Sequence, residues 1–191
     1  MTGNRIVVLT GPVGAGKTTV AERVVGLALR QGLTSGGILA PAMLNRCGQK
    51  VGIWGQDAQN AERRVLARAD RDLGGPRIGP YSFDDAALAW ALGVIEGAIG
   101  HCDLLVVDEI GRLELERGIG LAAILPGLAS GQTDRALVLV RDSLVGLLAD
   151  RLGTVDRVQF RVEQGSRGEL PGQIVAELLQ EEKSTDNQTE V

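Results

Sequence analysis

The sequence predicts a three-layer α/β sandwich in which helices cover both faces of a mainly parallel sheet. Short apolar runs rich in β-branched residues alternate with longer amphipathic runs, which is the pattern of strands joined by crossover helices. The length of 191 residues suits one domain of this class, because domains usually hold roughly 100–200 residues. We therefore expect a single domain over residues 1–181, followed by a polar tail over residues 182–191 that is disordered.

The first half of the chain is expected to begin with a buried strand and a helix. The strand is Ile6 to Thr10, and the helix is Lys17 to Arg30, with Gly32 in position for a left-handed C-terminal cap. The spacing of the apolar residues then changes from a helical period. Two apolar runs around a polar turn predict a small antiparallel hairpin insert over about residues 36–57. Residues 58–72 are polar and rich in arginine, and we interpret them as a solvated face.

The second half continues the alternation of strands and helices. Ser82 to Asp85 provide capping side chains for a helix whose apolar face ends at Ile99. The remaining predicted elements are a strand over residues 104–107, a helix around 117–125, a strand over 136–140, a helix over 143–152, a strand over 157–162 and a last helix that Pro171 opens. This order again favours a parallel sheet with helices on its faces.

A glycine-rich loop lies between the first strand and the first helix. Residues 11–18 fit the pattern G-x-x-x-x-G-K-[ST] of the P-loop, in the strand-to-helix context that its mechanism requires. The glycines let successive backbone N–H groups face phosphates, and the helix N-terminus adds partial positive charge. Lys17 should reach the β- and γ-phosphates, Thr18 should ligate magnesium, and Thr19 should contact the α-phosphate. The predicted nucleotide-binding residues of the loop are Gly11, Pro12, Val13, Gly14, Ala15, Gly16, Lys17, Thr18 and Thr19.

A second motif is a hydrophobic strand that ends in two carboxylates, Asp108 and Glu109. In this Walker B pattern the strand delivers Asp108 beside the phosphate loop, where it can hold magnesium together with Thr18. Glu109 then faces the γ-phosphate, where it can orient a water molecule or accept its proton. A glutamate directly after the aspartate favours the additional-strand (ASCE, RecA-like) class of P-loop NTPases, in which another strand lies between the two motif strands.

Phosphoryl transfer also needs positive charge near the γ-phosphate. Arg141, at the end of the strand predicted over residues 136–140, and Arg112, just past the acidic pair, are candidates, and the alternative for each is an ordinary surface arginine. We take Glu109, Lys17 and Arg141 as the predicted catalytic residues.

Residues 108–115, Asp-Glu-Ile-Gly-Arg-Leu-Glu-Leu, extend the acidic strand end in a more specific pattern. They resemble the motif D-E-I-G-[KR]-[ML]-E-L of the THEP-type nucleoside-triphosphatases. Three other stretches are similar to that family, namely Lys50 to Ile53, Arg77 to Phe83 and Ser166 to Pro171. The resemblance covers residues 4–180.

This resemblance implies a small ASCE-type domain that hydrolyses ATP, GTP and other nucleotides with loose base preference and depends on magnesium. Carried onto this sequence, it implies that residues 11–19 bind phosphates, that the acidic pair handles magnesium and water, and that Arg167 contacts the nucleotide. Two positions depart from the family. Asn45 stands where members often have arginine, and Ser166 replaces the asparagine that precedes Arg167.

Composition restricts the partners and the location that we expect. A net charge of −4 gives no general attraction for a phosphate backbone, so nucleic acid is not an expected partner. No apolar stretch approaches the roughly 20 residues of a membrane helix, and no signal peptide is readable at the N-terminus. We expect a cytoplasmic protein whose ligand is an NTP, and the sequence indicates no particular protein partner.

Two other functions fit the motifs. A nucleotide or small-metabolite kinase would use the same phosphate loop, with the arginine-rich segment Arg63 to Arg71 as a lid. Glu109 argues against this reading, because nucleotide kinases usually lack that carboxylate. Phosphate transfer to an added acceptor instead of water would indicate a kinase. A non-enzymatic NTP-dependent switch or accessory factor with negligible turnover is the other alternative, and phosphate release with and without magnesium would test it.

Overall fold

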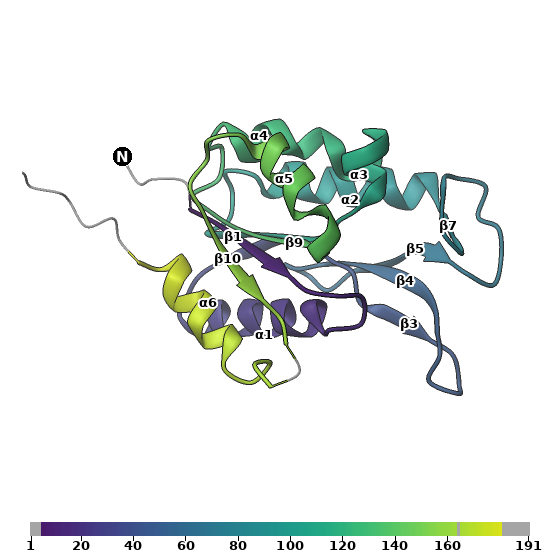
Figure 1. Ribbon diagram of the computed structural model, residues 1–191, viewed down its shortest axis with the longest axis horizontal. Helices are drawn as coiled ribbons and strands as arrows, with labels where there is room; N and C mark the ends of the chain where they lie inside the picture. The colour runs from purple at the N-terminus through teal and green to yellow at the C-terminus, as the bar shows by residue number, and fades with distance from the viewer. Residues whose placement is uncertain (1–4, 164, 181–191) are drawn as a thin grey trace, which may run out of the picture.

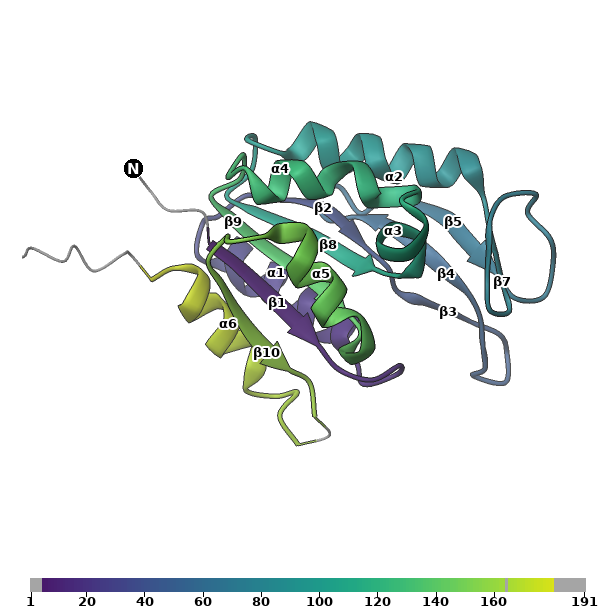
Figure 2. The same ribbon diagram turned by 45° about the horizontal axis from the view of Figure 1, so that its top comes forward.

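The computed structural model describes residues 5–163 and 165–180, and in this part of the chain ten strands form one sheet (Figure 1). The strand order is β10-β1-β9-β8-β2-β4-β5-β7-β6, and β3 pairs with β4 outside this path. Helices cover both faces of the sheet, as the sequence predicts (Figures 1 and 2). The tail predicted over residues 182–191 lies outside the described residues.

Five neighbouring strands form the parallel half of the sheet: β10 (Arg157–Arg161), β1 (Arg5–Thr10), β9 (Arg135–Val140), β8 (Leu104–Ile110) and β2 (Ser35–Leu39). β9 lies between β1, which leads into the P-loop, and β8, which ends in the acidic pair. This arrangement confirms the additional-strand class. It also brings the carboxyl ends of β1, β8 and β9 to one edge, because parallel strands end on the same side.

The other five strands are antiparallel to their neighbours, and we call them the antiparallel extension: β3 (Ala42–Leu44), β4 (Lys50–Asp57), β5 (Arg63–Arg68), β6 (Arg77–Ile78) and β7 (Tyr81–Phe83). The antiparallel insert predicted over residues 36–57 is present, since β4 pairs with both β3 and β2, but its first strand, β2, also joins the parallel half by pairing with β8. Gly37 allows this pairing, because a Cβ there would lie 2.1 Å from the carbonyl oxygen of Val106.

The extension also reaches further along the chain than expected. Residues 63–68 form strand β5, whose Leu66 and Ala67 are buried, and so they are not simply a solvated face. Along β5, Arg63 and Arg64 are exposed, whereas Leu66 and Ala67, which are adjacent and so face opposite sides of the sheet, are buried. The polar composition of residues 63–68 therefore led to the prediction of a solvated face where the structure has a strand.

The helices divide between the two faces of the sheet (Figures 1 and 2). One face carries α1 (Lys17–Arg30) and α6 (Leu170–Leu178), which pack together over β1 and β9. The other face carries α2 (Asp85–Ala98), α3 (Arg112–Arg117), η1 (Gly120–Ile124), α4 (Leu125–Ala129), η2 (Asp142–Leu144) and α5 (Val145–Leu152). Each face has its own hydrophobic cluster, because successive residues of a strand point to opposite sides.

Several helix ends follow the sequence prediction, and one helix does so only in part. α1 spans the predicted residues, and Gly32 after it has φ +82°. The Asp84 side chain caps α2 by accepting a hydrogen bond from Ala87 N at 2.7 Å. The helix predicted around residues 117–125 is confirmed only in part, because Gly118 and Gly120, with φ near +67° and +66°, end α3 and the helical turns resume as the 3-10 helix η1.

Across the described part of the chain, no helix combines the length and the apolar character that crossing a membrane requires.

Candidate active site

The phosphate loop curls between the end of β1 and the start of α1. Gly16 occupies the residue before the helix with φ +93° and ψ +25°, a left-handed conformation that favours glycine. It offers no side chain over the first helical N–H groups, which therefore stay available to an anion. The Lys17 ammonium lies inside the curl, where it donates to Gly11 O at 3.0 Å and approaches Pro12 O at 3.4 Å.

Asp108 lies at the carboxyl end of β8 and is 3% exposed. Its carboxylate accepts hydrogen bonds from Ala40 N at 2.9 Å and from the Thr18 side chain. Burial raises the pKa of Asp108 to about 6, and these two hydrogen bonds oppose the rise. The structure thus brings together the two residues that the sequence assigned to magnesium.

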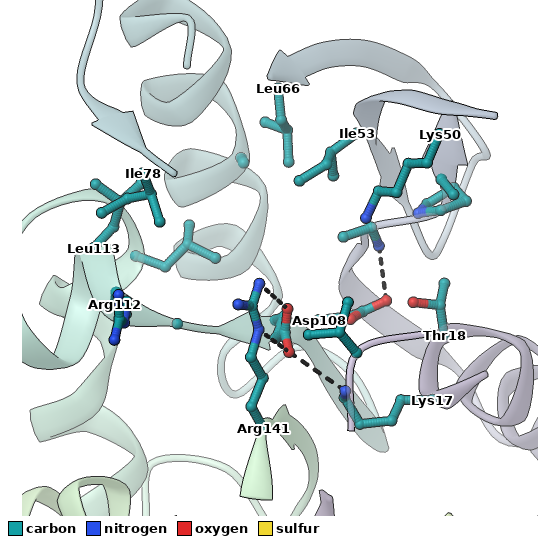
Figure 3. Close-up of a pocket in the computed structure, with 18 of the residues that line it drawn as sticks. Lys17, Thr18, Lys50, Ile53, Leu66, Ile78, Asp108, Arg112, Leu113 and Arg141 are labelled. Carbon is teal, nitrogen blue, oxygen red and sulfur yellow. Dashed lines mark hydrogen bonds and ion pairs between the residues drawn. The ribbon is translucent and has the colours of Figure 1, made fainter. Parts of the chain in front are cut away.

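Glu109 lies between two cations, and its side chain is a quarter exposed. Its Oε1 is 3.5 Å from Lys17 Nζ and 3.3 Å from Arg141 Nε. Arg141 directly follows β9, the strand between the two motif strands, so it reaches the acidic pair from the neighbouring strand (Figure 3). The three predicted catalytic residues are therefore in one cluster.

A cavity of about 370 Å³ opens from this cluster. Its polar half contains Lys17, Asp108, Glu109 and Arg141, together with the loop residues Val13, Gly14, Gly16, Thr18 and Thr19. Gly11, Pro12 and Ala15 shape the loop and do not line the cavity. The other half is apolar and is formed by the antiparallel extension with α2, α3 and η1. The cavity size is within the ordinary range for small-molecule sites, roughly 300–1,000 Å³.

Lys50 also lines the cavity, and motif reasoning assigned it no role. It begins β4, and its ammonium lies 5.4 Å from the centre of the Tyr81 ring and points toward the cavity (Figure 3). Burial lowers the pKa of Lys50, and the attraction of Glu109 opposes that effect. The signal available in the sequence was its place in the stretch Lys50 to Ile53, which resembles the family.

Glu114 is a second residue whose role the sequence did not reveal. It is 5% exposed, and its carboxylate accepts hydrogen bonds from Gly111 N at 2.9 Å and Leu121 N at 3.2 Å. Burial raises the pKa of Glu114, and these backbone hydrogen bonds oppose the rise. It therefore ties η1 to the turn that follows the acidic pair, which fixes the wall of the cavity on that side.

The two other arginines considered from the sequence lie at the margins of the site. Arg112 lines the cavity, but its guanidinium is largely exposed and lies 3.3 Å from Glu116. Arg167 is not among the lining residues. Its side chain crosses the P-loop, with Nε 3.3 Å from where a Cβ on Gly16 would lie.

The donor set at the loop fits magnesium that is shared with a nucleotide. Within residues 5–163 and 165–180, no group of three or more His, Cys, Asp or Glu side chains could hold a metal ion. Mg²⁺ in nucleotide sites usually takes one or two protein oxygens and completes its shell with phosphate oxygens and water. The Thr18 hydroxyl and the buried Asp108 carboxylate are two such oxygens, already within hydrogen-bond reach of each other.

Comparisons with known proteins agree with this geometry. A family model described as NTPase matches residues 6–175. The chain belongs to this NTPase family. Its relatives include proteins called nucleoside-triphosphatase THEP1, as the motif at residues 108–115 predicts. The protein of that name from Methanopyrus kandleri is 34% identical over 91% of this chain and 95% of its own length. The one from Thermofilum pendens is 31% identical over 89% and 93%.

Two solved structures show the same fold. The crystal structure of THEP1 from the hyperthermophile Aquifex aeolicus superposes with a TM-score of 0.73 at 16% identity, covering 92% of this chain and 99% of the other. The solution structure of a human cancer-related nucleoside triphosphatase gives a TM-score of 0.66 at 24% identity, covering 90% and 96%. These similarities support the predicted α/β fold class.

Proposed function

We propose that this protein binds a nucleoside triphosphate with magnesium at the P-loop and hydrolyses it to the diphosphate and phosphate. The position of Glu109, between Lys17 and Arg141 at the mouth of the loop, carries the proposal. A carboxylate held beside two cations can accept a proton from water while the cations attract the phosphate under attack. The relatives called nucleoside-triphosphatases support the same reaction.

Binding rests on the loop and on Lys17. The N–H groups at the start of α1 and the partial positive charge of that helix would hold the phosphates. The Lys17 ammonium now donates to Gly11 O and pairs with Glu109, and it would turn to the β- and γ-phosphates. Thr19, in the first turn of α1, is proposed to contact the α-phosphate, and Arg167, whose side chain lies beside Gly16, is proposed to contact the rest of the nucleotide.

Thr18 and Asp108 would hold magnesium together with phosphate oxygens. The ion would supply positive charge to the β- and γ-phosphates. Ala40 N fixes one oxygen of Asp108, so the carboxylate is already oriented toward Thr18. Desolvation of this buried group favours a cationic neighbour, since a positive charge lowers the cost of keeping Asp108 ionised.

Hydrolysis would then depend on Glu109, Arg141 and Lys50. Glu109 takes a proton from water, the water oxygen forms a bond to the γ-phosphorus, and the bond from that phosphorus to the β,γ-bridging oxygen breaks. Arg141 and Lys50 are proposed to meet the negative charge on the γ-phosphate from β9 and β4. Lys50 is suited to this role because no ion pair occupies its ammonium among the described residues.

Base preference should be loose, because the residues that we propose as ligands address phosphate and magnesium. The proposal also retains a cytoplasmic location. It includes no nucleic-acid partner, because the net charge of −4 does not favour one.

The test of hydrolysis and base preference is phosphate release from ATP, GTP, CTP and UTP, with and without magnesium. We expect release from all four within about tenfold of one another, and only with the metal. A hundredfold preference for one base would contradict the loose preference, and no release from any of them would contradict hydrolysis.

A further inference from the structure

The apolar half of the cavity has no role in holding a triphosphate. Eight apolar side chains wall it, and we call this part the apolar chamber: Ile53, Leu66, Ile78, Phe83, Leu88, Ala91, Leu113 and Leu121. They come from β4, β5, β6, β7, α2, α3 and η1. Phosphates and magnesium gain nothing from such walls, since their binding depends on charge and hydrogen bonds. A cavity with one apolar half and a few polar groups at its end is the usual form of a small-molecule site.

The nucleoside of the bound triphosphate cannot be the occupant. Lys17 and Glu109 mark the γ-phosphate end of the site, while Thr19, further along α1, marks the α-phosphate end. In Figure 3, Ile78 and Leu113 lie on the opposite side of Arg141 from Lys17 and Thr18. Ile53 and Leu66 lie nearer Lys50 in the same view, so the part of the chamber formed by Ile78 and Leu113 is the part that lies beyond the γ-phosphate, away from the α-phosphate end.

Glu109 is where the two halves of the cavity meet. It lines the same cavity as the chamber, and its carboxylate is paired with Lys17 on the phosphate side. A hydroxyl group on a molecule in the chamber would therefore reach the same carboxylate that serves water. Because Leu66, Leu88, Leu113 and Leu121 are each at least nine-tenths buried, the occupant must present an apolar body to them.

The geometry points to a second substrate site: we propose that the chamber binds a small alcohol with an apolar body, which accepts the γ-phosphoryl group in place of water. The inference rests on the proposed function, since both reactions use Glu109 as the base. Glu109 takes the hydroxyl proton, and the alcohol oxygen forms a bond to the γ-phosphorus. The bond from that phosphorus to the β,γ-bridging oxygen breaks, so the products are a phosphate monoester and the nucleoside diphosphate. Water attacks when the chamber is empty.

The experiment incubates the full chain with magnesium and γ-labelled ATP and measures the phosphate monoester and free phosphate in the same sample. The probes are 1-hexanol and benzyl alcohol, and ethanol at equal concentration is the control without an apolar body. 1-Hexanol carries four more methylenes than ethanol, and burying only two of them is worth roughly tenfold, so we expect at least about tenfold more monoester from 1-hexanol than from ethanol.

A matched pair of variants locates the effect. Ile78→Ser makes the chamber wall polar, whereas Ile119→Ser makes the same change at a position that is 42% exposed and outside the cavity. We expect the ratio of monoester to phosphate to fall about tenfold in the first variant and to stay unchanged in the second. Ile53→Ser, on another strand, should repeat the fall, and melting temperatures identify any variant that has not folded.

Four results would overturn the inference: free phosphate as the only product, equal monoester from ethanol and 1-hexanol, inhibition by 1-hexanol without monoester, or equal ratios in Ile78→Ser and Ile119→Ser. The proposed hydrolysis is judged separately, from phosphate release without alcohol. Monoester formation without such release would overturn hydrolysis alone, and absence of both products would overturn both proposals.

Discussion

The parallel half of the sheet and the antiparallel extension contribute to the cavity in different ways. The parallel half provides polar side chains that belong to two sequence motifs. Lys17 and Thr18 follow β1, and the acidic pair lies at the end of β8. The extension provides Lys50 and much of the apolar chamber, and these residues form no recognised motif. A contiguous motif predicts its own local geometry, whereas a wall assembled from several strands is visible only after folding.

This contrast can be tested by asking whether binding depends on the parallel half and whether turnover depends on both. If the extension is only a scaffold, substitutions of its cavity residues that preserve folding should leave the chemistry unchanged. The predictions below separate these two cases.

Lys17→Ala should have the largest effect on binding. The buried ammonium is the cation inside the curl of the P-loop, and removing one partner of a buried charged contact costs about 2–5 kcal/mol. We expect affinity for magnesium-ATP to fall by roughly a thousandfold, measured by titration calorimetry. Lys50 lines the same cavity but belongs to β4 and lies outside the P-loop, so it should not replace Lys17. Wild-type affinity in the variant would contradict the P-loop assignment.

Glu109→Gln should separate turnover from binding. The amide keeps the size of the side chain but cannot accept the proton, so turnover should fall by roughly 100-fold, as for the loss of a general base. Lys17, Thr18 and Asp108 remain, so magnesium-ATP should still bind. Phosphate release and affinity are measured on the same protein, with Glu116→Gln as the control, since that exposed carboxylate pairs with Arg112 away from the acidic pair. Undiminished release would show that Glu109 is not the base.

Lys50→Ala tests whether the extension takes part in the chemistry. A cation that meets charge developing in the transition state should affect turnover more than binding. We expect turnover to fall about tenfold with a small change in affinity, and Lys50→Arg to restore most of it. Arg46→Ala is the matched control, because this exposed cation lies on the same hairpin outside the cavity. Equal turnover in both alanine variants would leave the extension as a scaffold.

Asp72→Asn should have the smallest effect and concerns the stability of the extension alone. Asp72 accepts hydrogen bonds from Gly74 N and the Ser82 hydroxyl and pairs with Arg77, and these contacts hold its pKa well below the usual range. A lowered folded pKa stabilises the protein above the unfolded pKa of about 3.9 and loses this effect as pH falls. The variant should therefore melt below the wild type at neutral pH, and the difference should shrink on acidification below about pH 4. A difference independent of pH would rule out the carboxylate as its source.

Errors in the sequence prediction concentrate where glycine and arginine occur in unusual contexts. Gly118 and Gly120 divided an expected helix because both adopt positive φ, which an apolar pattern cannot reveal. Strand β5 was not predicted because its sequence is rich in arginine and only Leu66 and Ala67 in it are buried. Central strands and long helices were predicted well, because their apolar periods repeat over many residues.

By itself, the sequence determined the P-loop, the acidic strand end, most of the parallel strands and helices in their order along the chain, and the family. These features are contained in short segments whose spacing reflects backbone geometry and ligand chemistry. Only the tertiary structure decided that Arg141 lies 3.3 Å from Glu109, that Lys50 shares their cavity, and that the extension continues to Phe83. The first two join segments separated by more than 30 residues, and the third depends on the pairing of β5 with β7. Such partners are set by strand pairing and side-chain packing, which a local sequence pattern does not contain.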